Sequence, residues 1–156
     1  MIIEATASHF ALLRVGNAPD GLRLPPDDLA PDEVIDMLGK LADSIRPHFE
    51  PNAWIIVEDD EIVGLCSMVR APELDGTHVG YGVAPSRWGL GIATRAIADL
   101  LAWARSEPLL DWIGAETGVD NIASQRVLEH NGFQRIGTRI DNEDGPLLCW
   151  RANTKL

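Results

Sequence analysis

The chain has 156 residues, of which 46% are apolar and 24% charged, and its formal net charge at pH 7 is −11. This composition is typical of a globular protein that buries a moderate core, and we expect one domain over residues 1–156. The negative charge argues against nucleic acid as a main partner. It suits a cationic amine as substrate, although acidity can also serve solubility alone.

The sequence indicates neither a membrane partner nor a metal or redox centre. No apolar run approaches the roughly 20 residues of a membrane span, and the first residues, MIIEATASHF, lack the pattern of a secretory signal. The two cysteines, Cys66 and Cys149, have no metal-binding or redox spacing, and we interpret them as reduced core thiols. We therefore expect a cytoplasmic protein that holds no metal.

The first half of the chain predicts a short strand, two helices and a hairpin. Residues 2–4 favour a strand, and Ser8 is placed to cap a short helix that Gly16 ends. After a loop rich in prolines and acids, Pro31 begins a helix that runs to residue 45 with apolar residues at helical spacing. Residues 53–70 then predict two strands joined by a polar turn.

The second half of the chain predicts strands and helices in alternation. In order they are a strand at 77–85, a helix at 91–106, a strand at 112–117, a helix at 121–133 and two final strands at 133–141 and 145–152. Because a helix connects the strands at 77–85 and 112–117, we expect these two to be parallel neighbours. Gly80 and Gly82 in the first of them indicate a bulge or a close approach.

A glycine-rich bend lies between the strand that ends near Val83 and the helix that follows it. Gly89 and Gly91 leave the backbone open where a helix start has unpaired N–H groups and partial positive charge. A phosphate is the natural ligand of such a place. The glycines alone are weak evidence, because tight turns also use them, and neither a Walker loop nor a dinucleotide fingerprint is present.

The wider pattern is more specific. The segment VAPSRWGLGIAT at 83–94 is followed by a long helix, a strand and then NIASQRVLEHNGF at 121–133. From about Thr77 to Arg151 the chain resembles the GNAT superfamily of acyl-CoA-dependent N-acetyltransferases, and Trp88 makes it similar to the branch that acetylates ribosomal-protein N-termini. The resemblance implies an α/β fold with a mixed, mostly antiparallel sheet of six to seven strands. About four helices would flank this sheet, and a splayed parallel strand pair would lie at its centre.

The resemblance implies acetyl-CoA as co-substrate. Main-chain N–H groups between residues 88 and 94 would bind its pyrophosphate, and its pantetheine arm would lie between the splayed strands. For Trp88 we favour packing over the pantetheine or the core. The Val83 N–H is expected to donate a hydrogen bond to the carbonyl oxygen of the acetyl thioester. The implied cofactor-binding residues are Val83, Trp88, Gly89, Leu90, Gly91, Ile92, Ala93, Thr94, Asn121 and Ser124.

Three residues are candidates for the proton transfers that acetylation of an amine requires. Glu116 is our first choice as base, and His78 is the second because its ordinary pKa suits the task. Many relatives carry a tyrosine acid where this chain has Leu128, so we expect Ser124 to donate a hydrogen bond to the leaving sulfur, as is proposed for a serine in the ribosomal-protein-like branch. The structural alternatives are a solvated carboxylate for Glu116 and an outward-pointing ring for His78. Asn121 serves as a helix cap in either case.

The sequence-based hypothesis is an N-acetyltransferase that acts on a primary amine, either a protein N-terminus or a small molecule, by direct attack in a ternary complex. Its alternatives are an acyl-CoA-binding sensor without turnover, which Leu128 favours, and an unrelated α/β protein. Secondary candidates for contacts with the cationic amine are Asp27, Asp28 and Glu50. A homodimer is a further option, because C-terminal strands pair in relatives.

Overall fold

The computed structural model describes residues 1–19 and 21–155. Its strands are β1 (Ile2–Glu4), β2 (Ala53–Glu58), β3 (Glu61–Met68), β4 (Gly76–Val83), β5 (Trp112–Gly118), β6 (Gln134–Asp141) and β7 (Gly145–Asn153). Its helices are α1 (Ala7–Arg14), α2 (Asp32–Ile45), α3 (Ile92–Arg105) and α4 (Ile122–His130), with a 3₁₀ turn at Pro85–Arg87. None of the helices within these residues has the length and apolar character needed to cross a membrane.

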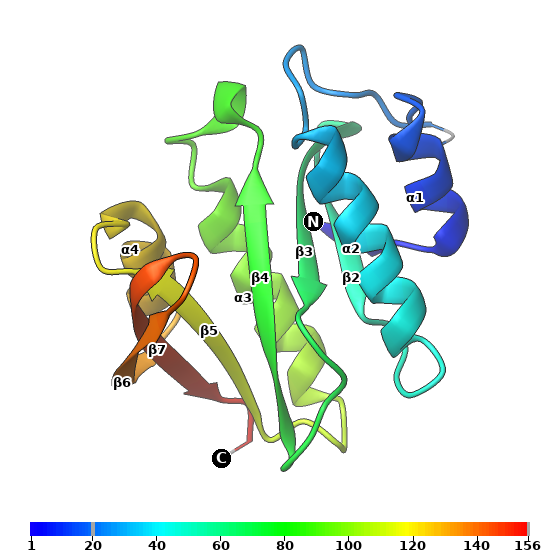
Figure 1. Ribbon diagram of the computed structural model, residues 1–156. Helices are drawn as coiled ribbons and strands as arrows, with labels where there is room; N and C mark the ends of the chain where they lie inside the picture. Colours follow the sequence, from blue (N-terminus) through cyan, green and yellow to red (C-terminus); the bar gives the residue numbers. More distant parts are fainter. Residues whose placement is uncertain (20, 156) are drawn as a thin grey trace.

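The strands form one sheet in the order β1-β2-β3-β4-β5-β7-β6. Only β4 and β5 are parallel within the described residues, and every other neighbouring pair is antiparallel. Helices α1 and α2 lie in front of the sheet, whereas α3 crosses behind it (Figure 1). The expected fold class, a mixed and mostly antiparallel sheet with four helices and a central parallel pair, is confirmed.

Two apolar clusters lie on opposite faces of the sheet, as the two-residue period of its strands requires. On β3, Leu65 packs with Ile35 of α2 on one face, whereas its neighbour Cys66 packs with Leu100 of α3 on the other. Burial raises the pKa of the Cys66 thiol to about 12, in keeping with a core thiol. The two clusters fix α2 in front of β2 and β3 and α3 behind the sheet.

The cap of α1 differs from the sequence-based prediction. Thr6, not Ser8, is the N-cap residue: its hydroxyl accepts a hydrogen bond from the His9 N–H, and the His9 ring accepts one from the Thr6 N–H. This reciprocal arrangement satisfies two helix-start donors at once, which a cap at Ser8 would not do. Ser8 lies inside the helix.

The pairing of β4 with β5 covers only one end of both strands. It runs from Gly76 opposite Trp112 to His78 opposite Gly114 and then stops. Beyond that point β4 pairs only with β3, and β5 pairs only with β7. The two strands diverge toward the end where α4 begins (Figure 1). The splay implied by the resemblance is therefore present in the middle of the sheet.

The glycines of β4 do not form a bulge. The register of β3 against β4 is continuous, and the only irregularity among β1 to β4 lies between Ile56 and Val57 on β2. A Cβ atom on Gly82 would meet nothing within 4 Å, and one on Gly80 would meet only Val69 at 3.9 Å. Of the two alternatives predicted for these glycines, the bulge is absent, whereas the backbone of Gly82 does approach Gly64 closely. Both glycines also leave free space over the face of the strand that lines the cavity beneath α2.

Gly64→Ala is expected to destabilise the protein by about 2 kcal/mol or more, because overpacking is costly where backbone cannot yield. The added Cβ would lie 2.3 Å from the backbone oxygen of Gly82. Gly80→Ala is the matched control on the neighbouring strand, since its Cβ has room. Urea unfolding of the two variants and the parent measures the difference, and equal midpoints would contradict the close approach of β3 and β4.

Candidate active site

The loop between β4 and α3 is fixed against the β2–β3 hairpin by two arginines. Arg87 donates from Nε and Nη2 to the Glu61 carboxylate at 2.8 and 3.0 Å. Arg95, in the first turn of α3, donates to Glu58 at 2.9 Å and to the carbonyl oxygen of Leu90 at 3.0 Å. Together these pairs connect both ends of the loop to the same hairpin.

The loop presents backbone N–H groups to solvent. Gly89 and Gly91 have φ of +77° and +76°, a conformation that glycine adopts without strain. Gly91 is the N-cap of α3 and provides no side-chain acceptor, and the first intrahelical bond runs from the Arg95 N–H to the Gly91 carbonyl at 3.1 Å. The N–H groups of the three residues before Arg95 therefore have no acceptor within the helix. With the helix dipole, they form a site suited to an anion.

Trp88 does not pack in the core. Its side chain is 68% exposed, and its indole Nε1–H donates to the Val83 carbonyl oxygen at 2.7 Å. That part of the sequence-based expectation is wrong, because the indole is needed to satisfy a backbone oxygen at the end of β4 that no strand reaches.

The backbone of β4 turns alternate polar groups toward the diverging strand β5. The Ala84 N–H donates to the Val63 oxygen at 2.8 Å, and the Val69 N–H donates to the His78 oxygen at 2.9 Å. Even-numbered residues of β4 thus direct their backbone groups to β3, so the odd-numbered residues from 79 to 83 direct theirs to the side of β5. The ladder with β5 ends at His78 opposite Gly114, so no strand pairs with Tyr81 or Val83 on that side.

A pair of hydroxyl groups connects the two sides of the splay. The Tyr81 side chain reaches from β4 to the start of α4, where its oxygen lies 2.7 Å from Ser124 Oγ. Burial raises the pKa of the Tyr81 hydroxyl, which therefore keeps its proton at neutral pH. Asn121 caps α4 as expected, with its Oδ1 accepting from the Ser124 N–H at 3.1 Å. Leu128 is fully buried in the core.

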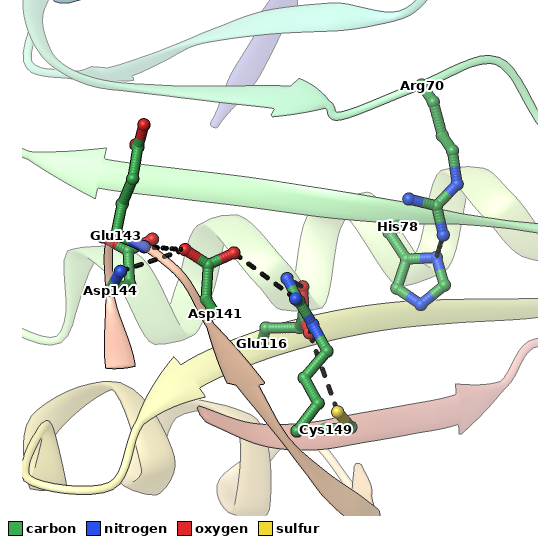
Figure 2. A network of polar contacts seen from close by, with 8 residues as sticks. Arg70, His78, Glu116, Asp141, Glu143, Asp144 and Cys149 are labelled. Carbon is green, nitrogen blue, oxygen red and sulfur yellow. Dashed lines mark hydrogen bonds and ion pairs between the residues drawn. The ribbon is translucent and has the colours of Figure 1, made fainter. Parts of the chain in front are cut away.

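Glu116 is bound to an arginine that the sequence did not suggest. Arg139 of β6 pairs with both carboxylate oxygens, with Nη2 to Oε1 at 2.9 Å, and also contacts Asp141 at 3.3 Å. The Cys149 thiol donates to the same carboxylate at 3.7 Å (Figure 2). The hydrogen bond from Arg139 is the main reason that the pKa of Glu116 lies below its ordinary value. The carboxylate is ionised at neutral pH, and the same hydrogen bond makes it a weaker proton acceptor than a free one.

His78 lies near the start of β4, at the end of the strand that is distant from the loop. Arg70 Nη2 contacts its Nδ1 at 3.0 Å (Figure 2), and Trp112 packs against the ring edge-on. Because arginine can only donate, Nδ1 accepts and the neutral ring carries its proton on Nε2. Burial and then the charge of Arg70 lower the pKa of His78, so the ring is neutral at pH 7.

A cavity of about 700 Å³ lies between α2 and the sheet. Its floor includes Gly80 and Gly82 of β4 with Leu65 and Ser67 of β3, and its roof comes from α2. Pro85 and Trp88 line it at the end where β4 stops. Neither His78 nor Glu116 lines this cavity.

The predicted cofactor residues come together around the splay. Residues 88–94 form the loop and helix start, Val83 ends β4 beside them, and Asn121 with Ser124 opens α4 on the far side. Of the secondary acidic candidates, Asp28 lines the cavity, whereas Asp27 accepts hydrogen bonds from the Ser86 N–H at 3.0 Å and from its hydroxyl. Glu50 is exposed and outside the cavity.

Comparison with known proteins identifies the family. The family model described as an acetyltransferase (GNAT) domain matches residues 2–134. The chain therefore belongs to the GNAT acetyltransferases, and the resemblance found in its sequence is confirmed.

Individual relatives agree with this assignment. The uncharacterized N-acetyltransferase p20 of Bacillus licheniformis is 29% identical over 112 residues, which are 71% of this chain and 62% of that protein. The chain spans about half to three fifths of the length of the curated relatives it matches first.

Two solved structures share the fold. The ribosomal-protein acetyltransferase RimL in complex with coenzyme A is 18% identical with a TM-score of 0.72, over 97% of this chain and 92% of that one. The aminoglycoside acetyltransferase AAC(6')-Ib in complex with coenzyme A is 16% identical with a TM-score of 0.69, over 98% and 94%.

Sequence reasoning missed two side chains at the site, Tyr81 and Arg139. Tyr81 lies on strand β4. The alternation of that strand, with Tyr81 two residues after the apolar Val79, was the available signal that the ring faces α3 and α4. Arg139 carries no such signal, because its contact with Glu116 depends on β7 lying between β5 and β6.

Glu116→Gln is expected to lower stability at pH 7 and to make it less sensitive to acid. The folded-state pKa of Glu116 lies below its ordinary value of 4.5, so the unfolded chain binds more protons between the two pKa values. The parent therefore loses this contribution as pH falls from about 4.5 through the folded pKa, and the variant, which lacks it, does not. Urea midpoints at pH 7 and in that acid window measure the gap between them. Exposed Glu129→Gln is the control, and a gap that stays constant with pH would contradict the role of this ion pair.

Proposed function

We propose that the protein transfers an acetyl group from acetyl-CoA to a primary amine by direct attack within a ternary complex. The interrupted pairing of β4 with β5 supports this best, because it leaves a row of backbone donors and acceptors without a strand partner in the middle of a sheet. A ligand with peptide-like amides, such as the pantetheine arm, satisfies such groups by adding a strand. The adjacent start of α3 suits the pyrophosphate of the same molecule.

The residues present fit coenzyme A at both places. The N–H groups from Gly89 to Thr94 would hold the pyrophosphate, because the Trp88 N–H already donates to the Pro85 carbonyl oxygen at 3.2 Å. Backbone groups of β4 would hold the arm, with Asn121 on the far side. When bound, the cofactor supplies an activated acetyl thioester. The N–H of Val83, which faces the splay, is the proposed donor to the thioester carbonyl oxygen, where negative charge develops.

The Tyr81 and Ser124 hydroxyls are the proposed donors to the leaving sulfur. A thiol with a pKa near ~8.5 leaves with modest assistance from a hydrogen bond. Tyr81 keeps its proton because burial raises its pKa, and Ser124 lies within 2.7 Å to relay or share it. Because Leu128 cannot act as the acid, this pair of hydroxyls would replace it. Their presence favours an enzyme over a sensor.

The structure favours a reaction in which neither Glu116 nor His78 removes the proton from the amine. The ion pair with Arg139 favours a positioning role for Glu116 at the splay over direct proton abstraction, and the Nδ1 of His78 is engaged by Arg70. We propose that proton loss from the amine relies on its removal from water, with a solvent molecule as the acceptor.

Gly91→Ala is expected to weaken acetyl-CoA binding about tenfold or more, because a Cβ at this left-handed position strains the loop whose N–H groups bind the pyrophosphate. Gly16→Ala is the matched control, since Gly16 has the same φ of +76° and lies at the end of α1. Calorimetric titration with acetyl-CoA measures both. Unchanged binding to the Gly91 variant would remove the proposed cofactor site.

Tyr81→Phe and Ser124→Ala are each expected to lower kcat about tenfold to a hundredfold, with little change in acetyl-CoA affinity. If the hydroxyls act as a unit, the double variant is hardly slower than the slower single variant. Release of coenzyme A thiol in the presence of a panel of primary amines gives the rates. Tight acetyl-CoA binding by the parent without turnover on any amine would favour the sensor instead.

A further inference from the structure

The cavity beneath α2 is apolar almost throughout. Among the described residues that line it, Asp28 is the only one that carries a charge at neutral pH. The roof consists of Val34, Met37, Leu38 and Leu41 of α2. A ligand body that lies here replaces water on apolar surface, and this replacement is the source of its binding free energy.

The other polar groups of the lining already have partners. Ser67 Oγ donates to the Met68 carbonyl oxygen at 3.1 Å, and the Tyr81 hydroxyl is shared with Ser124 at 2.7 Å. The Trp88 indole N–H donates to the β4 backbone at 2.7 Å. Within the described residues the cavity therefore offers one counter-charge, and a second positive group would meet only neutral oxygens there.

The position of Asp28 places that charge at one end of the cavity. Its neighbour Asp27 accepts a hydrogen bond from the Ser86 N–H at 3.0 Å, which holds this segment beside the loop that follows β4. Asp28 thus lies at the end lined by Pro85 and Trp88, where β4 ends and the splay is widest. From there the apolar roof extends along α2 from residue 34 to 41, a length of about 10 Å at the helical rise.

We propose that the acceptor is a primary amine whose reacting nitrogen carries its only positive charge and whose remaining body is apolar and about the length of this roof. The inference rests on the acetyl transfer proposed above and names its substrate class. A polyamine or an aminoglycoside carries further ammonium groups, and a charge without a partner in an apolar site is strongly disfavoured. The acidic rim attracts the ammonium group, and the apolar interior then receives the rest of the molecule.

The same surroundings prepare the amine for attack. Removal from water lowers the pKa of an ammonium group, because the charged form loses the most solvation. Asp28 is exposed and lies at the mouth, so it attracts the cation without stabilising it deep inside. The neutral nucleophile is therefore favoured next to the Val83 backbone, although neither Glu116 nor His78 lines the cavity.

Two sources have this chemistry: a free arylalkylamine or alkylamine, and the N-terminal residue of a polypeptide that begins with an apolar side chain. The test compares 2-phenylethylamine, hexylamine, spermidine, and two tetrapeptide amides that begin with Leu or with Glu. Each is assayed for release of coenzyme A thiol from acetyl-CoA. Binding is measured separately by calorimetry in the presence of coenzyme A, so that the result does not depend on turnover.

The expected result is that 2-phenylethylamine, hexylamine or the Leu peptide binds about tenfold or more tightly than spermidine or the Glu peptide. Preference for the Leu peptide over both free amines identifies the polypeptide source, and the reverse identifies the small-molecule source. Equal or tighter binding of spermidine overturns the inference, even if the protein acetylates it and the proposed function stands. Binding of the apolar amines without turnover supports the inference and contradicts the proposed function.

A variant pair tests the cavity itself. Met37→Asp adds a second carboxylate to the roof at a residue that is 55% exposed, so the fold tolerates it. It should weaken 2-phenylethylamine binding and strengthen spermidine binding, reducing the preference about tenfold or more. Ser44→Asp makes the same change of charge on an exposed residue of α2 outside the cavity and should keep the parental preference. An equal effect of both variants would show that only overall charge matters and would overturn the proposal.

Discussion

The pairing between β4 and β5 stops after His78 and Gly114, and this break determines the shape of the candidate site. A break of this kind in the middle of a sheet leaves backbone groups without partners, which folded proteins rarely allow. Here part of the requirement is met from outside the ladder, because the Trp88 indole binds the Val83 carbonyl oxygen at the end of the strand. The groups that remain face the splay and define what kind of ligand it can accept.

The hairpin β2–β3 holds the two halves of the site together. It binds the loop between β4 and α3 through Arg87 on Glu61 and Arg95 on Glu58, and its second strand also forms part of the cavity floor through Leu65. The loop and the cavity therefore share one rigid support. In a reaction between two bound molecules, such support keeps the reacting atoms aligned, and alignment accounts for much of the rate gain.

In the proposed reaction, proton loss from the amine depends on burial more than on a dedicated base. The ionised carboxylate of Glu116 is paired with Arg139, and Arg70 engages His78. We propose instead that the cavity favours a neutral amine by removing it from water, and that Tyr81 and Ser124 supply hydroxyl donors on the opposite side. In this proposal the two proton transfers take place on separate faces of β4.

The order and type of the elements could be predicted from the sequence. So could the glycine-rich helix start, the Asn121 cap and the family, because each depends on residues close together in the chain. The sequence placed Glu116 near the splay, but it could not supply the partner that lowers the pKa of Glu116, since Arg139 lies 23 residues away and two strands across. Only the tertiary structure brought Tyr81 to Ser124 over 43 residues and enclosed the apolar cavity between α2 and β4. The physical reason is that local patterns fix backbone conformation, whereas contacts between side chains depend on how separate elements pack.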